Sequence, residues 1–596
     1  MSATSFPSQT PLDAAPRKSR VGRIILFVVL GIVALLLVLG GVAYAVAGRF
    51  FTAQHNTLAL LPSDTQLYAS INPNLSAIPG LTRLQKAYQQ SDPEASADAE
   101  QQLEDTLGLN FRTDVQPWIG AEMAIAVSGI QQFDADADAE ELARTADVSI
   151  LLASRDDAKA EEALAKIRAK RQADHGESFT DETYKSVKIT SSSGGEDASP
   201  LGAYAIVEHN AVIASRADTI KQMIDRVGAT ENTLAQSDAY KQTIAGLPAD
   251  AVAYAYISGD LIRDAVELSY DQTLEQVGDN AALREQIERQ RQVMNAFVGG
   301  GASISAPAEG VQFDASIKFD MAQLNQLDQE MRDTINAAKT PISDALLRSI
   351  SKDAILTYAG PIPDTFRTQI ERVITSSPEA EQQVAALEQQ FDLDLEQDVL
   401  GWLSGEFALV ALPAGEQSDE SMLADVPVSG YLVVRSKDMA AAKAGLPKIA
   451  TALEQVGGVA FESKQIGGAE WQTISDPGTE QALGGYGFVG DAVVLGFLEP
   501  GLAGAAGASS AALPDDATFK AAQGRVASPS GGLLYLDVPA AVDVALNVRD
   551  QSRADFEQSE AGKALKPIES VIAGGEPGIN DEGLFKSRLF VTINEQ

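Results

Sequence analysis

Two glutamates are the residues of this sequence that are best suited to chemistry as a pair. Glu122 and Glu406 occupy equivalent places in two similar stretches of the chain. Glycoside hydrolases place two carboxyl groups around the bond that they cleave, so such a pair could supply an acid and a nucleophile. The alternative is structural, with each carboxylate capping a loop or pairing with a cation. Because no further catalytic signature accompanies them, we expect the structural role and no catalytic residue.

Two short motifs resemble known binding or catalytic sequences but lack the partners that those need. Gly485 to Gly490 reads GxGxxG, yet the apolar residues that follow predict a strand where a dinucleotide site needs a helix. Ser349 to Lys352 matches the SxxK of penicillin-binding enzymes without the SDN and KTG segments. The sequence therefore predicts no bound cofactor and no enzymatic activity.

Metal-binding patterns are equally incomplete. The acidic run at residues 134–141 resembles a calcium loop, but Ala139 and Thr145 stand where an EF-hand needs glycine and glutamate. Loose calcium binding and a solvated acidic loop are the two interpretations, and we favour the second. The 3 histidines are scattered and the chain has 0 cysteines, so disulfides and thiol catalysis are excluded. We predict no metal site.

Composition narrows the classes of partner. The 596-residue chain carries a net charge of −38, which repels phosphate backbones and argues against nucleic-acid binding. An exported eukaryotic protein of this size usually contains disulfides. Their absence indicates a bacterial cell envelope.

The longest apolar run, residues 24–47, contains no charged residue. As a helix it would reach about 36 Å, which is enough to cross the ~30 Å hydrocarbon core of a bilayer. Basic residues precede it at Arg17, Lys18, Arg20 and Arg23, and only Arg49 follows closely. We therefore predict a basic cytoplasmic tail at residues 1–23, one transmembrane helix at 24–47 with the lipid bilayer as its partner, and an extracytoplasmic remainder.

A cleaved signal peptide is the alternative for this run. Ala43-Tyr44-Ala45 matches the small-x-small pattern that precedes cleavage. The run is longer than the ~7–15 apolar residues of a typical signal peptide, which favours an uncleaved anchor.

An internal repeat organises the rest of the chain. The segment with Asp114, Trp118 and Glu122 recurs with Asp398, Trp402 and Glu406 at a constant offset. We interpret these six residues as a structural repeat signature. Both tryptophans lie among apolar residues, which favours core packing over a ligand-stacking platform.

Equivalent secondary structure follows each signature in the same order. Strands at 148–152 and 431–434 each lead into a helix, and hairpins are expected at 204–213 and 486–495. Each half closes with an alternating strand, at 311–319 and 589–593. These patterns predict an α+β fold of two tandem duplicated lobes, residues 57–325 and 341–596, each an antiparallel sheet packed with helices.

Two local features add further expectations. Leu283, Ile287, Met294 and Phe297 form an apolar stripe at helical spacing, and we expect Gly299-Gly300-Gly301 to end that helix. The Gly/Ala/Ser-rich segment at 502–514 is typical of a flexible loop.

Two elements resemble those of a known family. Leu61-Pro62-x-Asp64 with Tyr68, and the segment from Asp114 to Gly120, resemble hallmarks of the bacterial domain-of-unknown-function 3352 family. The resemblance implies a membrane-anchored envelope protein and supplies no catalytic residue. The second half departs from the pattern, with Leu400-Gly401 in place of Gln116-Pro117.

These observations favour a non-enzymatic envelope protein that binds a ligand or a protein partner outside the cytoplasm. One alternative is an extracytoplasmic hydrolase that uses acidic residues. The other is a carrier of an apolar ligand, which predicts an apolar tunnel between the sheet and the helices.

Overall fold

The computed structural model describes residues 57–72, 108–130, 145–194, 201–277, 281–337, 339–363, 365–375, 378–415, 426–508, 511–526, 531–548 and 552–594. Within these ranges no helix is long and apolar enough to cross a membrane. The expected tail at 1–23, the expected span at 24–47 and the acidic run at 134–141 lie outside the described residues.

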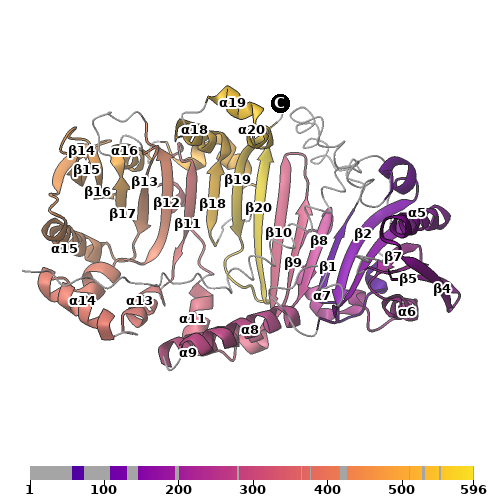
Figure 1. The fold of residues 1–596 in the computed structure, drawn as a ribbon. Coiled ribbons are helices and arrows are strands. Elements are labelled where there is room, and N and C mark those ends of the chain that lie inside the picture. Colours follow the sequence, from indigo (N-terminus) through magenta and orange to yellow (C-terminus); the bar gives the residue numbers. More distant parts are fainter. Residues whose placement is uncertain are drawn as a thin grey trace, which may run out of the picture.

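The described strands belong to one 20-stranded sheet, in which every pairing is antiparallel (Figure 1). The strands of the first half of the chain are β1 (Leu67–Ile71), β2 (Ile119–Ser128), β3 (Asp147–Ser154), β4 (Ser178–Tyr184), β5 (Val187–Ser193), β6 (Ala203–Val207), β7 (Asn210–Ala214), β8 (Ala253–Ser258), β9 (Phe297–Ser305) and β10 (Gly310–Phe319). Those of the second half are β11 (Leu356–Ile362), β12 (Gly405–Pro413), β13 (Val428–Arg435), β14 (Glu462–Ile466), β15 (Ala469–Ser475), β16 (Ala482–Val489), β17 (Ala492–Phe497), β18 (Leu533–Asp537), β19 (Ile568–Gly575) and β20 (Leu584–Ile593).

Both halves arrange their strands in the same spatial order. The first half runs β4-β5-β6-β7-β3-β2-β1-β8-β9-β10. The second runs β14-β15-β16-β17-β13-β12-β11-β18-β19-β20. The last strands of the two halves pair with each other, with Phe313 opposite Leu589. The sheet is therefore continuous rather than divided between two lobes, and this pairing satisfies two edges that would otherwise be exposed.

One face of the sheet, here called the covered face, carries short helices along much of its width. They are η1 (Thr57–Ala59), α6 (Ala217–Arg226), η4 (Leu234–Gln236), α7 (Asp238–Ile244), α12 (Asp344–Leu347), α16 (Leu498–Gly507), η6 (Leu513–Asp515) and α17 (Ala517–Gln523). In the first half Ile220, Leu234 and Tyr240 pack into the core. In the second half Leu502 and Phe519 do the same.

Two long helices pack on the opposite face, each near one end of the sheet. They are α5 (Asp157–His175) and α15 (Met439–Gly457), and each follows a strand and begins at an aspartate cap. Asp156 accepts a hydrogen bond from the backbone N–H of Lys159, and Asp438 from that of Ala441. Both helices therefore begin with an aspartate side chain that accepts from a backbone N–H of the first turn.

The remaining helices lie near the ends of the strands (Figure 1). They are α8 (Gly259–Val277), α9 (Ala281–Asn295), α10 (Met321–Leu324), α11 (Gln329–Ala337), α13 (Thr365–Thr375), α14 (Pro378–Phe391), α18 (Val538–Val548), α19 (Arg553–Gln558) and α20 (Glu560–Leu565). Single helical turns, η3 (Phe111–Val115) and η5 (Leu395–Leu400), precede β2 and β12.

The prediction that three glycines end a helix was wrong. Helix α9 ends at Asn295, and Gly299, Gly300 and Gly301 lie inside strand β9. A Cβ on Gly299 would crowd the hydroxyl of Thr243 on α7, and one on Gly301 would press on the same residue. The glycines therefore let α7 lie close against the strand, which is a packing role rather than a cap.

The prediction of a flexible loop at 502–514 was also wrong for residues 502–507. Residues 498–507 form helix α16, and Leu502 and Ala505 are buried. A Cβ on Gly501 would overlap the carbonyl oxygen of Gly430 in β13. The small residues thus permit close helix-to-sheet packing, which composition alone does not distinguish from flexibility.

Candidate functional site

The repeat signature forms the same local structure in both halves. The side chain of Asn110 caps η3, and that of Asp394 caps η5. Trp118 Nε1 donates a hydrogen bond to the carbonyl oxygen of Asp114 over 2.6 Å, and Trp402 Nε1 donates to that of Asp398 over 3.1 Å. Each signature therefore closes a tight turn that leads into β2 or β12.

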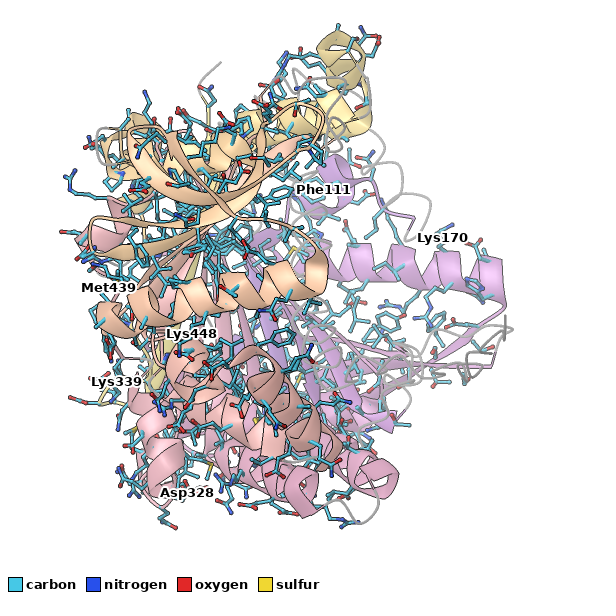
Figure 2. The ribbon with its side chains drawn as sticks, turned by 90° about the vertical axis from the view of Figure 1, so that its left-hand side faces the viewer. Phe111, Lys170, Asp328, Lys339, Met439 and Lys448 are labelled. Atoms are coloured by element: carbon cyan, nitrogen blue, oxygen red, sulfur yellow. The ribbon has the colours of Figure 1, made fainter. Side chains whose placement is uncertain are left out.

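A lysine from the long helix anchors each signature aspartate. Lys166 of α5 lies 2.6 Å from Asp114, and Lys448 of α15 lies 2.8 Å from Asp398. Figure 2 labels Lys448 midway along α15. Burial alone would raise the pKa of Asp114 and Asp398, but the hydrogen bonds from the lysine and from a backbone N–H hold both pKa values below the usual range.

The tryptophan side chains belong to the hydrophobic core. Trp118 is 2% exposed and packs with Leu164 and Tyr204, and Trp402 is 4% exposed and packs with Leu446 and Tyr486. Neither indole ring is available as a platform for a ligand.

Glu122 and Glu406 differ in their surroundings and lie far apart. Glu122 is buried on β2 and accepts a hydrogen bond of 2.9 Å from the hydroxyl of Tyr68. Burial, followed by the nearby charge of Glu122, raises the pKa of Tyr68 well above its usual value. Nine strand-to-strand steps separate β2 from β12, or about 40 Å along the sheet, so the two carboxylates cannot flank one bond.

Glu406 lines a cavity of about 340 Å³ together with Ser343, Arg435 and Asp491. Arg435 donates to Glu406 over 3.0 Å and to both oxygens of Asp491 over 2.5 and 2.8 Å. The backbone N–H of Ser343 donates to Glu406 over 2.7 Å. Met439, labelled in Figure 2 at the start of α15, also lines this cavity. One guanidinium thus joins two carboxylates, and the hydrogen bond from Ser343 ties the start of α12 to the sheet.

The motifs that resemble catalytic sequences lie in ordinary structural positions. Gly485 is inside β16 and Gly490 is in the turn before β17, so the GxGxxG pattern belongs to a hairpin. The hydroxyl of Ser349 donates to the carbonyl oxygen of Leu346 over 2.6 Å. His209 lies 2.8 Å from Asp157 at the surface. Within the described residues, no group of three potential ligands could hold a metal ion.

The feature that the sequence did not reveal is an apolar surface at the centre of the sheet, opposite the covered face. Directly paired residues point to the same side of a sheet, and a row of them crosses the strands from β12 to β9. The row comprises Leu409, Tyr358, Leu534, Ala573, Leu589, Phe313 and Ile304, and its last member, Ile304, packs against the buried cluster that contains Ala69 and Ala255. We call this surface the open face. In the part of the chain that the structure describes, no helix crosses in front of these central strands (Figure 1).

Three large side chains of the open face are exposed. Tyr358 and Leu409 are each 52% exposed and Leu534 is 37% exposed. On the covered face, their chain neighbours Thr357, Val410 and Tyr535 are at most 1% exposed. The three strands are therefore apolar on both sides, and Tyr358, Leu409 and Leu534 are exposed on the side opposite the covered face.

The first half does not expose the equivalent positions. The strand pairings match Tyr358 with Ala69 and Leu534 with Ala255. Ala69 is 3% exposed and Ala255 is 2% exposed, so both are buried. The two halves thus share a backbone arrangement but differ in what they present on this side.

The sequence of the three exposed strands contains a pattern that is consistent with the open face. Strands β11, β12 and β18 read LTYAGPI, GEFALVALP and LLYLD, which are apolar at consecutive positions rather than alternating. Such runs are typical of strands buried on both faces, so they do not by themselves predict an exposed one.

A family model described as "Protein of unknown function (DUF3352)" matches residues 28–591. The chain belongs to the DUF3352 family. The match includes both halves of this DUF3352 protein and both signature turns. No curated protein matches the sequence.

Solved structures resemble this DUF3352 protein only remotely. Crystal form I of TP0453 aligns with a TM-score of 0.22 and 9% identity, over 46% of this chain and 81% of that one. Crystal form III aligns with a TM-score of 0.23 and 9% identity, over 49% and 91%. Similarity at this level carries no argument about fold or function.

Proposed function

We propose that this DUF3352 protein is a non-enzymatic binding protein, anchored in the membrane by one helix, that holds an apolar ligand outside the cytoplasm. The observation that carries the proposal is the open face. An exposed apolar patch on a soluble domain is typical of a binding surface. Each methylene group that a ligand removes from water contributes about 0.8 kcal/mol.

The proposed anchor rests on the sequence alone. The uncharged run at 24–47 and the basic residues before it support one crossing with the N-terminus inside. Protease added to intact spheroplasts should digest the chain beyond about residue 49 and leave the apolar segment. Protection of the C-terminal part would contradict this topology.

We also propose that the fold arose by duplication of one unit of sheet and helices. The shared strand order and the two signature turns support this view. The polar network around Arg435 has no counterpart at the matched positions, which hold Ala153 and His209. The halves would thus have diverged while keeping their backbone arrangement.

The rival function, hydrolysis by acidic residues, lacks a specific supporting observation. Glu122 faces a tyrosine hydroxyl and Glu406 faces an arginine and a serine, and the two are far apart. A glycosidase and peptidase screen of the full chain, repeated with Glu122→Gln and Glu406→Gln, tests this. Activity in the natural protein that either change removes would overturn the non-enzymatic proposal.

A photolabelling experiment tests apolar binding. The full chain in lipid nanodiscs is irradiated with an uncharged alkyl diazirine, and labelled peptides are mapped by mass spectrometry. We expect labels on peptides from β11, β12 and β18 in addition to residues 24–47. Labelling confined to residues 24–47 would contradict the proposed binding surface.

A further inference from the structure

The asymmetry between the two halves indicates where a ligand binds and of what class it is. We propose that the open face of the second half holds an acyl chain of a membrane lipid across β18, β11 and β12, whereas the matching surface of the first half is closed. This inference rests on the proposed function and names its ligand and its place.

The location follows from size and exposure at matched positions. Tyr358 and Leu534 are large and exposed, while Ala69 and Ala255 are small and buried. Leu409 is 52% exposed, and its counterpart in the first half, Ile125, packs in a buried cluster. An apolar molecule therefore gains contact with large side chains in the second half only.

The hydrogen bonding of the sheet favours a hydrocarbon over an extended peptide. Strand β11 pairs with both β12 and β18, so its backbone groups are occupied by its neighbours. An extended peptide laid on this face would leave its own N–H and C=O groups without partners, and that costs free energy. An acyl chain has no such groups.

Charge argues against a second copy of the chain as the occupant. The net charge of −38 makes two copies repel each other over any shared surface. The same charge favours a lipid with a neutral or zwitterionic headgroup over an anionic one.

The length of chain between the apolar run and the first described residue favours a membrane lipid as the ligand. Residues 48–56 connect the apolar run at 24–47 to the first described residue, Thr57. Nine residues extend at most about 32 Å, at roughly 3.5 Å each. An anchored chain therefore keeps Thr57 within about 32 Å of the bilayer, where acyl chains are the most abundant apolar molecules.

The test uses the full chain reconstituted in vesicles of phosphatidylcholine that carries a diazirine in one acyl chain. After irradiation, labelled peptides are mapped by mass spectrometry. We expect labels on residues 356–360, 407–411 and 532–536, and far fewer on the matching residues 67–71, 123–127 and 253–257. Equal labelling of both halves would overturn the proposed location.

Two variants make the test specific. Leu409→Glu places a charge in the apolar row and should reduce labelling of the second half about tenfold, equivalent to about 1.4 kcal/mol. Val227→Glu is the control, because Val227 is 40% exposed on the covered side of the first half, just after α6. It should leave labelling unchanged, and an equal loss in both variants would overturn the assignment.

The remaining outcomes separate this inference from the proposed function. If the alkyl diazirine labels the open face but the phospholipid probe does not, apolar binding stands and the lipid assignment fails. If neither probe labels it, both fail. If light scattering shows a dimer that Leu409→Glu dissociates and the lipid probe gives no label, the occupant is a second copy and the inference is wrong.

Discussion

At the scale of single residues, the signature turns show how one side chain can hold two neighbouring elements together. Trp118 and Trp402 each fill the core beneath a long helix while the indole nitrogen closes the turn behind it. The sequence predicts the core position of both rings, because apolar residues surround them. The sequence does not predict the hydrogen bond from each indole nitrogen to the aspartate carbonyl oxygen, because this bond depends on the helical turns η3 and η5.

Replacing Trp118 with alanine should destabilise the fold by ~3–5 kcal/mol, because it removes a large buried ring and leaves a cavity. Trp118→Phe keeps most of the buried area and leaves the carbonyl of Asp114 without its indole donor, so it should cost about 1–2 kcal/mol. Urea unfolding of the full chain measures both. Equal stability of Trp118→Ala and the natural protein would contradict the core role.

The ion pairs of the signature aspartates predict a dependence of stability on pH. Folding lowers the pKa of both carboxyl groups. Each ion pair therefore makes its full contribution to the free energy of unfolding above the pKa of the unfolded state, which is about 3.9. The contribution is lost as the pH falls through the lower value of the folded state. The urea midpoint of the natural protein should therefore fall towards that of Asp114→Asn/Asp398→Asn between about pH 5 and pH 2. If the difference between the two urea midpoints stayed constant over that range, the ionised carboxylates of the two pairs would not contribute to stability.

At the scale of elements, the sequence pattern predicted the hairpins and the two long helices but not the positions where glycine permits close packing. The hairpins at 203–214 and 482–497 follow from apolar strands around short polar turns. Helix α16 does not, because its run of glycine and alanine has no polar face and resembles a loop in composition. Only the distance to β13 reveals why small residues stand there.

Helix α16 offers a matched pair of glycines for a test. Gly501→Ala should destabilise the second half despite the higher helix propensity of alanine, because the new methyl group would overlap the backbone of Gly430. Gly507→Ala in the same helix meets nothing within 4 Å and should be neutral or stabilising by up to about 1 kcal/mol. Thermal unfolding followed by circular dichroism measures both, and the same effect from both changes would contradict close packing.

At the scale of the whole molecule, the pairing of β10 with β20 joins the halves into one sheet. The alternating patterns at 311–319 and 589–593 predict both strands, yet nothing in either pattern says that they pair with each other. Partner choice between distant strands depends on the assembled surfaces, which a single sequence does not display. The open face was not predicted for the same reason, because the exposure of its side chains depends on which strands the helices cover.

The junction between the halves contains an ion pair whose loss should uncouple them. Asp314 of β10 is 7% exposed and accepts a hydrogen bond of 2.6 Å from Arg588 Nε of β20. Arg588→Ala leaves this carboxylate without its cation and should cost about 1–3 kcal/mol. Calorimetry of the full chain should then show two separated unfolding transitions in place of one, because the paired strands are the contact that makes the sheet continuous.

Arg553→Ala, which removes an exposed pair with Asp543, is the control and should change stability by less than about 1 kcal/mol. An unaltered single transition in Arg588→Ala would mean that the apolar pairs along β10 and β20, such as Phe313 with Leu589, suffice to hold the halves together.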